Sequence, residues 1–405
     1  MFVFAFGQGL PGPGWPAFGR PQRERPSTTQ KRPGGSSDHA NVQSGLQTVS
    51  ATNAPEAVRK VGKVTSASIA AILEEGLKAE QAFVGNQNGD AKGALESAAM
   101  TVEAVYSYPF QNHACMEPMN ATALYTTDKC EVWVPTQDGE ASFAAVLPAS
   151  GLPHEKCEVY KINPGGGFGR RSAFQDYVTQ AVVIAKQIPG TPIKLLWTRE
   201  EDMLQGRFHP VMQCKLVGGF DASKNLTALH MRLSGQSILA AVRPAIVEQN
   251  KGKDPLVFQG VADAGEHALG YSVPNLLIDH AMRNTHVPPG FWRGVNINQN
   301  CIFMECFMDE LADAVGQDEL EFRRKLMSKH PRNLGVLNAA AERIGWGKPA
   351  PQGVHRGLAH MKAFNAYVAA AAERRADYLR RRACGAQRLF QGHGQAYPFV
   401  PAEEL

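Results

Sequence analysis

The chain has 405 residues, 43% of them hydrophobic and 20% charged, which is typical of a globular protein with two or three domains. Its formal net charge of +4 comes from the ends: residues 1–60 carry seven Lys and Arg against three Asp and Glu, and residues 371–405 carry six against four. The body between these ends is slightly acidic, which argues against a nucleic acid as a partner.

The cysteines also limit the possible classes of protein. All seven are scattered, and no CxxC pair occurs. This spacing excludes a zinc ribbon or an iron–sulfur cluster bound by this chain alone, and it predicts no disulfide framework. No apolar run reaches the roughly 18 residues of a transmembrane helix. Residues 1–6 are apolar but lack a preceding basic segment, so no export signal is predicted and the compartment, cytoplasmic or periplasmic, stays open.

The N-terminal part of the chain begins with a low-complexity stretch. Residues 7–50 are rich in Pro, Gly, Ser, Thr and Gln, so residues 1–60 are predicted to be a disordered tail. Helical spacing then predicts a helix over 66–82, with Ser66 or Ser68 as its N-cap. A polar loop is expected over 85–93.

The centre of the chain has the pattern of a strand–helix–strand unit. Residues 101–108 alternate like a half-buried strand, and two further strands are predicted over 130–135 and 157–162, with a helix over 140–150 between them. A glycine-rich loop, residues 165–171, directly follows the last of these strands. Open sheets commonly bind ligands at the C-terminal ends of their strands, so this loop is a candidate site.

The second half of the chain continues with alternating strands and helices. Residues 243–270 give no clear pattern. The predicted elements are a helix over 176–187, a strand over 193–197, a strand pair over 212–216 and 226–233, a strand over 276–282, and helices over 299–315, 319–329 and 333–344.

The glycine loop has the composition of a cofactor-binding turn. Its four glycines surround Phe168, so the backbone can adopt positive φ angles and direct several N–H groups at an oxo or phosphate oxygen. Arg170 and Arg171 are expected to add positive charge beside it. Taken alone, the loop is equally compatible with an ordinary tight turn.

Polar residues occur at three other strand ends. His113 and Glu117 are expected to have structural hydrogen-bonding roles, because Pro118 disfavours the helix that would make them joint metal ligands. Gln137 alone would be a surface amide. Arg293 follows Trp292, as in arginines held by aromatic packing for a phosphate or carboxylate, although a structural arginine is the commoner case.

Together these motifs carry a family resemblance. The order NHACMEP, WVPTQ, GGGFGRR and GFWRGVNINQN, followed by ECFMDELA, resembles the molybdopterin-binding large subunit of the xanthine dehydrogenase/aldehyde oxidase superfamily. The likeness covers residues 64–367 and is closest to the branch with the isoquinoline 1-oxidoreductase beta subunit. It implies an α+β (mixed α/β) fold of the molybdenum-cofactor-binding type, in incomplete form.

The resemblance also implies site residues. Gln137, Phe168 and Arg293 match the family positions near the apical ligand of molybdenum, the pterin and the substrate, and they are the implied catalytic set. No side chain of this chain is expected to ligate the metal, because the pterin holds it. The implied cofactor-binding residues are Gly166, Gly167, Phe168, Gly169, Arg170, Arg293 and Gly294.

The resemblance further implies a reaction and its partners. The family hydroxylates a carbon of an N-heterocycle or an aldehyde with oxygen from water, and a glutamate acts as general base. The implied cofactor is molybdopterin cytosine dinucleotide with molybdenum. Electrons leave through a small subunit that carries [2Fe–2S] clusters, so this iron–sulfur subunit is an expected partner.

The C-terminal part departs from the family pattern. The glutamate belongs to a GVGEP-like segment that this sequence lacks, so the chain is expected to be a truncated and inactive large subunit. The alternative is a noncatalytic module that binds a nucleotide, cofactor or partner. The expected domains are a tail (1–60), a helical linker (61–100), a first molybdopterin-binding domain (101–330), the start of a second (331–370) and an Arg/Ala-rich tail (371–405). An exposed helix is the simplest structure for residues 373–405. The competing hypothesis is that this end is frameshifted or truncated and that residues 1–60 are likewise foreign to the family.

Overall fold

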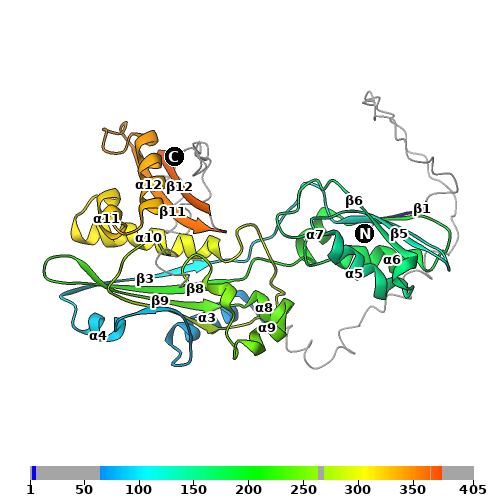
Figure 1. Cartoon of the computed structure of the whole chain (residues 1–405), viewed down its shortest axis with the longest axis horizontal. Helices are drawn as coiled ribbons and strands as arrows, with labels where there is room; N and C mark the ends of the chain where they lie inside the picture. Colours follow the sequence, from blue (N-terminus) through cyan, green and yellow to red (C-terminus); the bar gives the residue numbers. More distant parts are fainter. Residues whose placement is uncertain (1, 6–63, 263–268, 365, 376–405) are drawn as a thin grey trace.

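The computed structural model describes residues 2–5, 64–262, 269–364 and 366–375. These residues form two lobes, each built on a five-stranded sheet, and chain segments connect the lobes at several points (Figure 1). The strand order is β1-β7-β4-β5-β6 in the small lobe and β2-β10-β9-β8-β3 in the large lobe. Helices pack on both sheets, so the predicted α+β (mixed α/β) class is confirmed.

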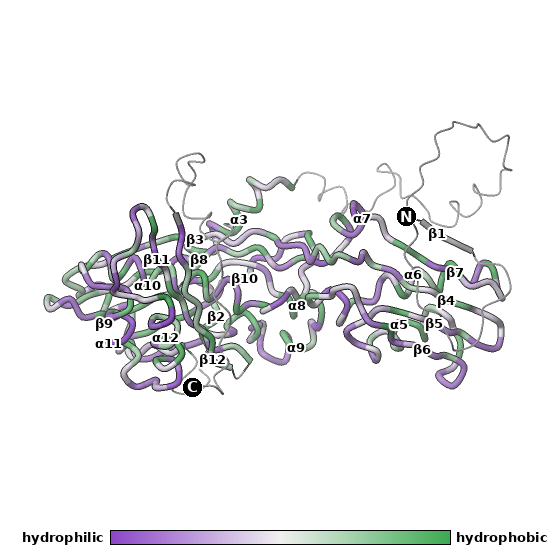
Figure 2. Tube along the Cα trace, turned by 90° about the horizontal axis from the view of Figure 1, so that it is seen from above, coloured by the Kyte–Doolittle hydropathy of each residue, from purple (hydrophilic) through white to green (hydrophobic). Residues whose placement is uncertain are grey.

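The small lobe contains the predicted strand–helix–strand unit. β5 and β6 run parallel with Cys130 opposite Cys157, and helix α5 connects them. Val132 and Val134 of β5 are fully buried in an apolar cluster that also contains residues of α5 and α6, and Figure 2 shows these two helices beside the sheet. The elements are β4 (Asn120–Tyr125), β5 (Cys130–Pro135), α5 (Gly139–Ser150), η1 (His154–Lys156), β6 (Cys157–Ile162), α6 (Asp176–Ala185), β7 (Ile193–Leu196) and α7 (Arg199–Leu204).

Two strands of this sheet were not predicted. β4 has the sequence NATALY, whose Asn and Ala residues have low strand propensity, but it pairs with β5 on one side and β7 on the other. Tertiary pairing therefore overrides local preference. β1 (Phe2–Ala5) pairs antiparallel with β7, so the prediction of disorder for residues 1–60 is wrong at Phe2–Ala5. Residues 6–63 lie outside the described part of the chain.

The large lobe is organised around the hairpin of β8 and β9, which was predicted and is confirmed. β10 lies parallel to β9, and α10 covers the sheet with a face that includes Phe303, Phe307 and Leu311. The strands are β2 (Phe83–Asn88), β3 (Met100–Tyr108), β8 (Met212–Phe220), β9 (Leu226–Gly235) and β10 (Asn275–Met282). The helices are α3 (Ser66–Lys78), α4 (Ala91–Glu96), α8 (Ile238–Val242), α9 (Pro244–Gln249), η2 (Pro255–Phe258), α10 (Ile297–Val315), α11 (Glu319–Leu326) and α12 (Pro331–Ile344).

The N-terminal elements of this lobe differ from the sequence expectation in detail. Thr65 is the N-cap of α3, and Ser68 completes its capping box from the third helical position. The predicted polar loop over 85–93 is wrong, because β2 and the start of α4 occupy it. β2 pairs with β10, and the Asn86 side chain donates to the carbonyl of Val261 at 3.0 Å, so a long-range hydrogen bond satisfies a polar residue that local patterns assign to a loop.

The last described residues form a hairpin of β11 (Val354–Ala363) and β12 (Ala366–Arg375). Val354 lies opposite Arg375, so the strand includes the first residues of the expected Arg/Ala-rich tail, and the expected exposed helix is wrong for residues 373–375. The proposed domain boundary at residue 370 falls inside β12, and the proposed first domain, residues 101–330, contributes to both lobes. In the described parts of the chain, no helix is long and apolar enough to cross a membrane.

Candidate functional site

Three of the predicted site residues meet where the two lobes join. The glycine loop, residues 165–171, follows β6, and its Gly169 N–H donates to Gln137 Oε1 at 2.9 Å. The carbonyl of Phe168 accepts a hydrogen bond from the N–H of Arg293 at 2.9 Å. The structure therefore brings Gln137, Phe168 and Arg293 together, although they are far apart in the sequence.

Two glycines of this loop are required by close approach. A Cβ at Gly167 would lie 2.8 Å from Gln137 Cγ and closer still to the amide, so any side chain would push Gln137 away. Gly169 has φ of +99°, and its Cβ would lie 2.5 Å from the carbonyl oxygen of Phe291. Because these two positions lack a side chain, the loop packs directly against Gln137 and the carbonyl of Phe291.

Phe168 is the exposed aromatic residue of the loop. Its φ is +52° and its side chain is 41% exposed, so the backbone adopts a left-handed conformation to turn an aromatic ring outward. The guanidinium carbon of Arg293 lies 5.1 Å from the Phe168 ring and 4.6 Å from the Trp292 ring. Aromatic packing thus positions a solvent-accessible positive charge beside the loop, as the sequence indicated.

The loop also has free backbone donors. The N–H groups of Gly166, Gly167 and Phe168 have no hydrogen-bond partner among the described residues, whereas that of Gly169 is used by Gln137. Gly166 has φ of +103°, so positive φ angles occur in the loop at residues 166, 168 and 169. Successive unpaired N–H groups in such a turn form a concave anion site. This feature fits a ligand with oxo or phosphate oxygens.

The arginines of the loop have a different role from the one expected. Arg170 and Arg171 are 1% and 0% exposed, so their guanidinium groups are in the interior and do not present charge at the loop surface. Arg170 binds Asp176 at 2.9 Å. Arg171 donates to the carbonyls of Gly166, Pro135 and Glu117 at 2.9, 3.0 and 2.7 Å. Both side chains therefore have the contacts of structural arginines, and the cofactor role of Arg170 stays a prediction.

Gly294 follows Arg293 in the loop 288–294, which lies between β10 and α10. It has φ of +80°, and a Cβ there would collide with the Asn298 side chain, whose amide donates to the carbonyl of Arg293. The glycine therefore allows the turn that leads from Arg293 into α10. Its predicted contact with a cofactor stays a prediction.

His113 and Glu117 have the predicted hydrogen-bonding roles. His113 is 7% exposed, and its Nε2 lies 2.6 Å from the carbonyl oxygen of Phe291. Burial lowers the pKa of His113 to about 4, although the Phe291 carbonyl opposes this shift, so the ring is neutral and Nε2–H donates. Glu117 Oε2 accepts from the N–H of Gly165 at 2.6 Å, which fixes the start of the glycine loop.

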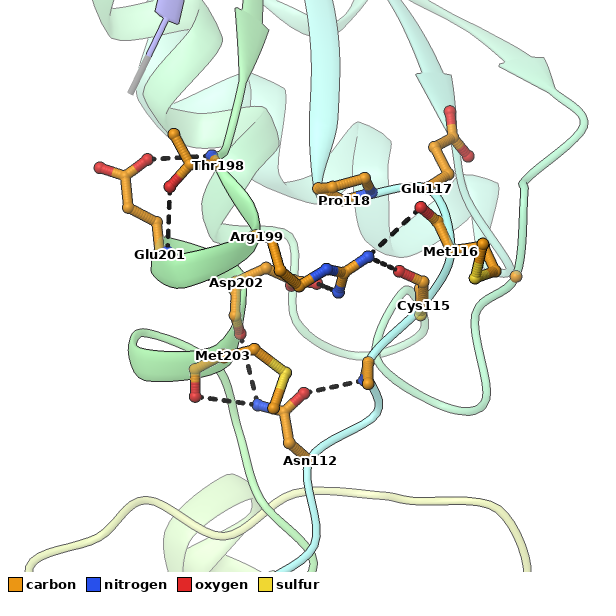
Figure 3. A network of polar contacts seen from close by, with 12 residues as sticks. Asn112, Cys115, Met116, Glu117, Pro118, Thr198, Arg199, Glu201, Asp202 and Met203 are labelled. Atoms are coloured by element: carbon orange, nitrogen blue, oxygen red, sulfur yellow. Dashed lines mark hydrogen bonds and ion pairs between the residues drawn. The ribbon is translucent and has the colours of Figure 1, made fainter.

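A second polar network supports this region, and sequence patterns did not predict it. Figure 3 shows that Arg199, at the start of α7, donates to the carbonyls of Cys115 and Met116 and binds Asp202 at 2.9 Å. The Asn112 amide donates to the carbonyl of Met203 at 3.1 Å. The capping box of Thr198 and Glu201 is a signal in the sequence for α7, but nothing local indicates that Arg199 reaches the segment 112–118.

Comparison with known families identifies the class of the protein. The family model for the molybdopterin cofactor-binding domain matches residues 74–327, which is more than half of the chain. The chain therefore belongs to this family. The matched residues include every predicted site residue, from Gln137 to Gly294.

Individual relatives agree with this family. The chain is 28% identical over 286 residues to isoquinoline 1-oxidoreductase subunit beta of Brevundimonas diminuta, covering 69% of this chain and 35% of the relative. It is also 27% identical over 243 residues to the nicotinate dehydrogenase large molybdopterin subunit of Eubacterium barkeri, covering 58% of this chain and 52% of that relative. The chain thus spans about a third of the length of the first relative and about half of the second.

A solved structure shows the same fold. Quinoline 2-oxidoreductase from Pseudomonas putida 86 superposes with a TM-score of 0.55 at 18% sequence identity, covering 71% of this chain and 38% of that one. At this identity the likeness supports the architecture alone. The fold of a molybdenum-cofactor-binding large subunit, predicted from the sequence motifs, is confirmed.

The described residues fit a molybdopterin group at the lobe junction. The free N–H groups of the glycine loop can donate to an oxo or phosphate oxygen, and the Arg293 charge lies beside them. Among the described residues, no three His, Cys, Asp or Glu side chains are grouped so that they could hold a metal ion. At this loop, such a group would meet backbone N–H donors, the Gln137 amide and the Arg293 guanidinium.

Proposed function

We propose that this chain forms the cofactor-contacting part of a molybdenum hydroxylase large subunit. The observation that carries the proposal is the junction of Gln137, Phe168 and Arg293 around the glycine loop, within residues matched by the molybdopterin-binding family. The glycine loop supplies backbone donors, and Arg293 supplies positive charge. When bound, the molybdenum cofactor supplies the redox chemistry of hydroxylation.

Gln137 is proposed to contact the cofactor through its amide nitrogen. Its Oε1 already accepts the Gly169 N–H, which fixes the orientation of the amide. The Nε2 group has no acceptor among the described residues and is on an exposed side chain, so its two N–H bonds are available to an oxo oxygen. The amide thus acts as a positioned donor next to the loop.

The finer assignments follow from the family resemblance and the names of the relatives. We propose molybdopterin cytosine dinucleotide as the form of the cofactor, because unpaired N–H groups and an arginine suit a pyrophosphate. We propose an N-heterocycle or an aldehyde as the substrate, and a small subunit with [2Fe–2S] clusters as the electron acceptor. The two relatives are themselves named as subunits, which supports the need for a partner.

The test is the cofactor content of the full chain purified from a host that makes molybdopterin. Elemental analysis measures molybdenum, and the pterin released on denaturation is identified by mass spectrometry. We compare the wild type with Gly167→Ala, whose new Cβ would displace Gln137, and with Gly335→Ala in α12, where a Cβ meets nothing within 4 Å.

The wild type and Gly335→Ala are expected to retain pterin, and Gly167→Ala is expected to retain less than a tenth of it. A wild-type protein without pterin would overturn the proposal. Recovery of an ordinary nucleotide without molybdenum would instead favour the noncatalytic binding module. Release of the cytosine dinucleotide form would support the finer assignment.

A further inference from the structure

Arg207 is a second arginine with an unusual environment near the cofactor loops. Its guanidinium carbon lies 4.5 Å from the ring of Phe174, which in turn stacks on Phe291 with ring centroids 6.4 Å apart. Phe291 is two residues before Arg293, and its carbonyl packs against Gly169. Arg207 thus belongs to the same set of contacts as the proposed cofactor site, although no sequence motif indicated it.

The backbone around Arg207 is held in place. The N–H of Phe208 donates to the carbonyl of Pro288 at 3.2 Å, and the N–H of Gly290 donates to the carbonyl of Phe208 at 2.8 Å. A Cβ at Gly290 would lie 2.6 Å from the Cβ of Arg207, so the two segments are in close contact. The base of the Arg207 side chain is therefore fixed against the loop 288–294.

The charge of Arg207 has no ionic partner in the described part of the chain. No ion pair joins Arg207 to Asp176, whose Oδ2 binds Arg170 at 2.9 Å. Burial lowers the pKa of Arg207, the negative charge of Asp176 only opposes this lowering, and the like charge of Arg170 lowers the pKa further. A half-buried guanidinium that stacks on a ring by one face keeps its N–H edge available, and such edges bind phosphate or carboxylate.

We propose that Arg207, held on Phe174, is an anion-binding residue of the cofactor site and takes the oxygens of a phosphate or a carboxylate. This inference rests on the proposed function, because it treats the loops 165–171 and 288–294 as the place where the cofactor binds. A phosphate would belong to the dinucleotide tail of the cofactor. A carboxylate would belong to an acidic aromatic substrate that packs on Phe174 and Phe291.

Isothermal titration of the full chain tests this proposal. The protein is purified from cells unable to make molybdopterin, so that no endogenous cofactor fills the site, and is titrated separately with inorganic pyrophosphate and with benzoate. The variants are Arg207→Ala, Arg207→Lys and the control Arg343→Ala, which removes an exposed arginine of α12 in the large lobe. Circular dichroism checks that each variant is folded.

Arg207→Ala is expected to weaken the binding of one probe by about tenfold or more, since charge-assisted bidentate hydrogen bonds are lost. Arg207→Lys retains the charge and is expected to show a smaller loss, and Arg343→Ala none. A loss for pyrophosphate assigns the site to a phosphate, and a loss for benzoate assigns it to a carboxylate. Binding of both probes by Arg207→Ala as tightly as by the wild type overturns the proposal, and so does a wild type that binds neither probe.

The two proposals can fail separately. If the wild type from a competent host carries pterin but Arg207→Ala binds both probes normally, the anion site is wrong and the proposed function stands. If the wild type carries no pterin while Arg207→Ala loses probe binding, the proposed function is wrong, and Arg207 binds an anion that is not part of this cofactor.

Discussion

Arg171 binds Glu117 twice, donating to its backbone carbonyl at 2.7 Å and to its carboxylate at 3.3 Å. Glu117 in turn accepts the N–H of Gly165, so a buried arginine and a carboxylate fix both ends of the glycine loop to the segment 112–118. The loop is therefore a rigid platform, and its geometry depends on residues that do not face the proposed cofactor.

Replacing Arg171 with Met should destabilise the whole protein. The guanidinium is fully buried, and its removal leaves the carbonyls of Pro135 and Gly166 without these donors. We expect a loss of about 3 kcal/mol or more in the free energy of unfolding, measured by urea denaturation. Arg343→Ala, at an exposed position, should change it by less than about 0.5 kcal/mol. A loss below about 1 kcal/mol for Arg171→Met would show that the loop is held by other contacts.

Gln137→Ala should separate cofactor retention from stability. Gln137 is exposed, so its removal should cost only about 1 kcal/mol, the typical value of one hydrogen bond. Pterin content should nevertheless fall at least fivefold, because both the loop anchor and the free amide donor are lost. The exposed Gln187 gives a matched control, Gln187→Ala. Equal pterin content in Gln137→Ala and the wild type would contradict the role of this amide.

Protonation of His113 should destabilise the fold in mild acid. Burial lowers its pKa to about 4, whereas an unfolded histidine has a pKa of about 6.5, so the unfolded state binds more protons between these values. The stability contributed by neutral His113 is therefore complete above about pH 6.5 and decreases as the pH falls to 4, by up to about 3 kcal/mol.

This pH dependence can be assigned with variants. His113→Asn should show a shallower loss of unfolding free energy between pH 6.5 and 4 than the wild type, whereas His355→Gln, at an exposed position of β11, should retain the wild-type slope. Urea titrations at several pH values give the slope. His280 is a second buried histidine with a pKa lowered by burial to about 4, so His113→Asn should reduce the slope without abolishing it. An unchanged slope in His113→Asn would exclude this residue as its source.

Glu305→Gln should loosen the packing of the C-terminal elements on α10. Burial alone would raise the pKa of Glu305, but Arg323 and His360 lower it to about 2, so it is ionised and accepts from Arg323 at 3.2 Å and from the N–H of His360 at 3.0 Å. Neutralising it leaves the buried Arg323 with less compensation, and we expect a loss of about 3 kcal/mol. The rate of backbone hydrogen exchange should increase in β11 and β12 before it increases in the other strands. Unchanged protection of these strands would contradict this contact as their anchor.

The sequence alone determined much of this protein. Alternation and helical spacing predicted β3, β5, β6 and the β8–β9 pair, because these segments carry their apolar residues in a regular period. The motifs at Gln137, Phe168 and Arg293 also identified the family, since residue type and order are sequence properties.

The tertiary structure decided the rest. β4 and β2 form because neighbouring strands pair with them, which local composition does not encode. Arg170 and Arg171 resemble surface charges in the sequence, yet both are buried, and the carbonyl of Glu117, 54 residues from Arg171, accepts a hydrogen bond from it. Arg207 becomes a candidate only when Phe174 and the loop 288–294 surround it. The physical reason is common to all three: burial and long-range hydrogen bonds depend on which segments meet in space, and a sequence window contains only one of them.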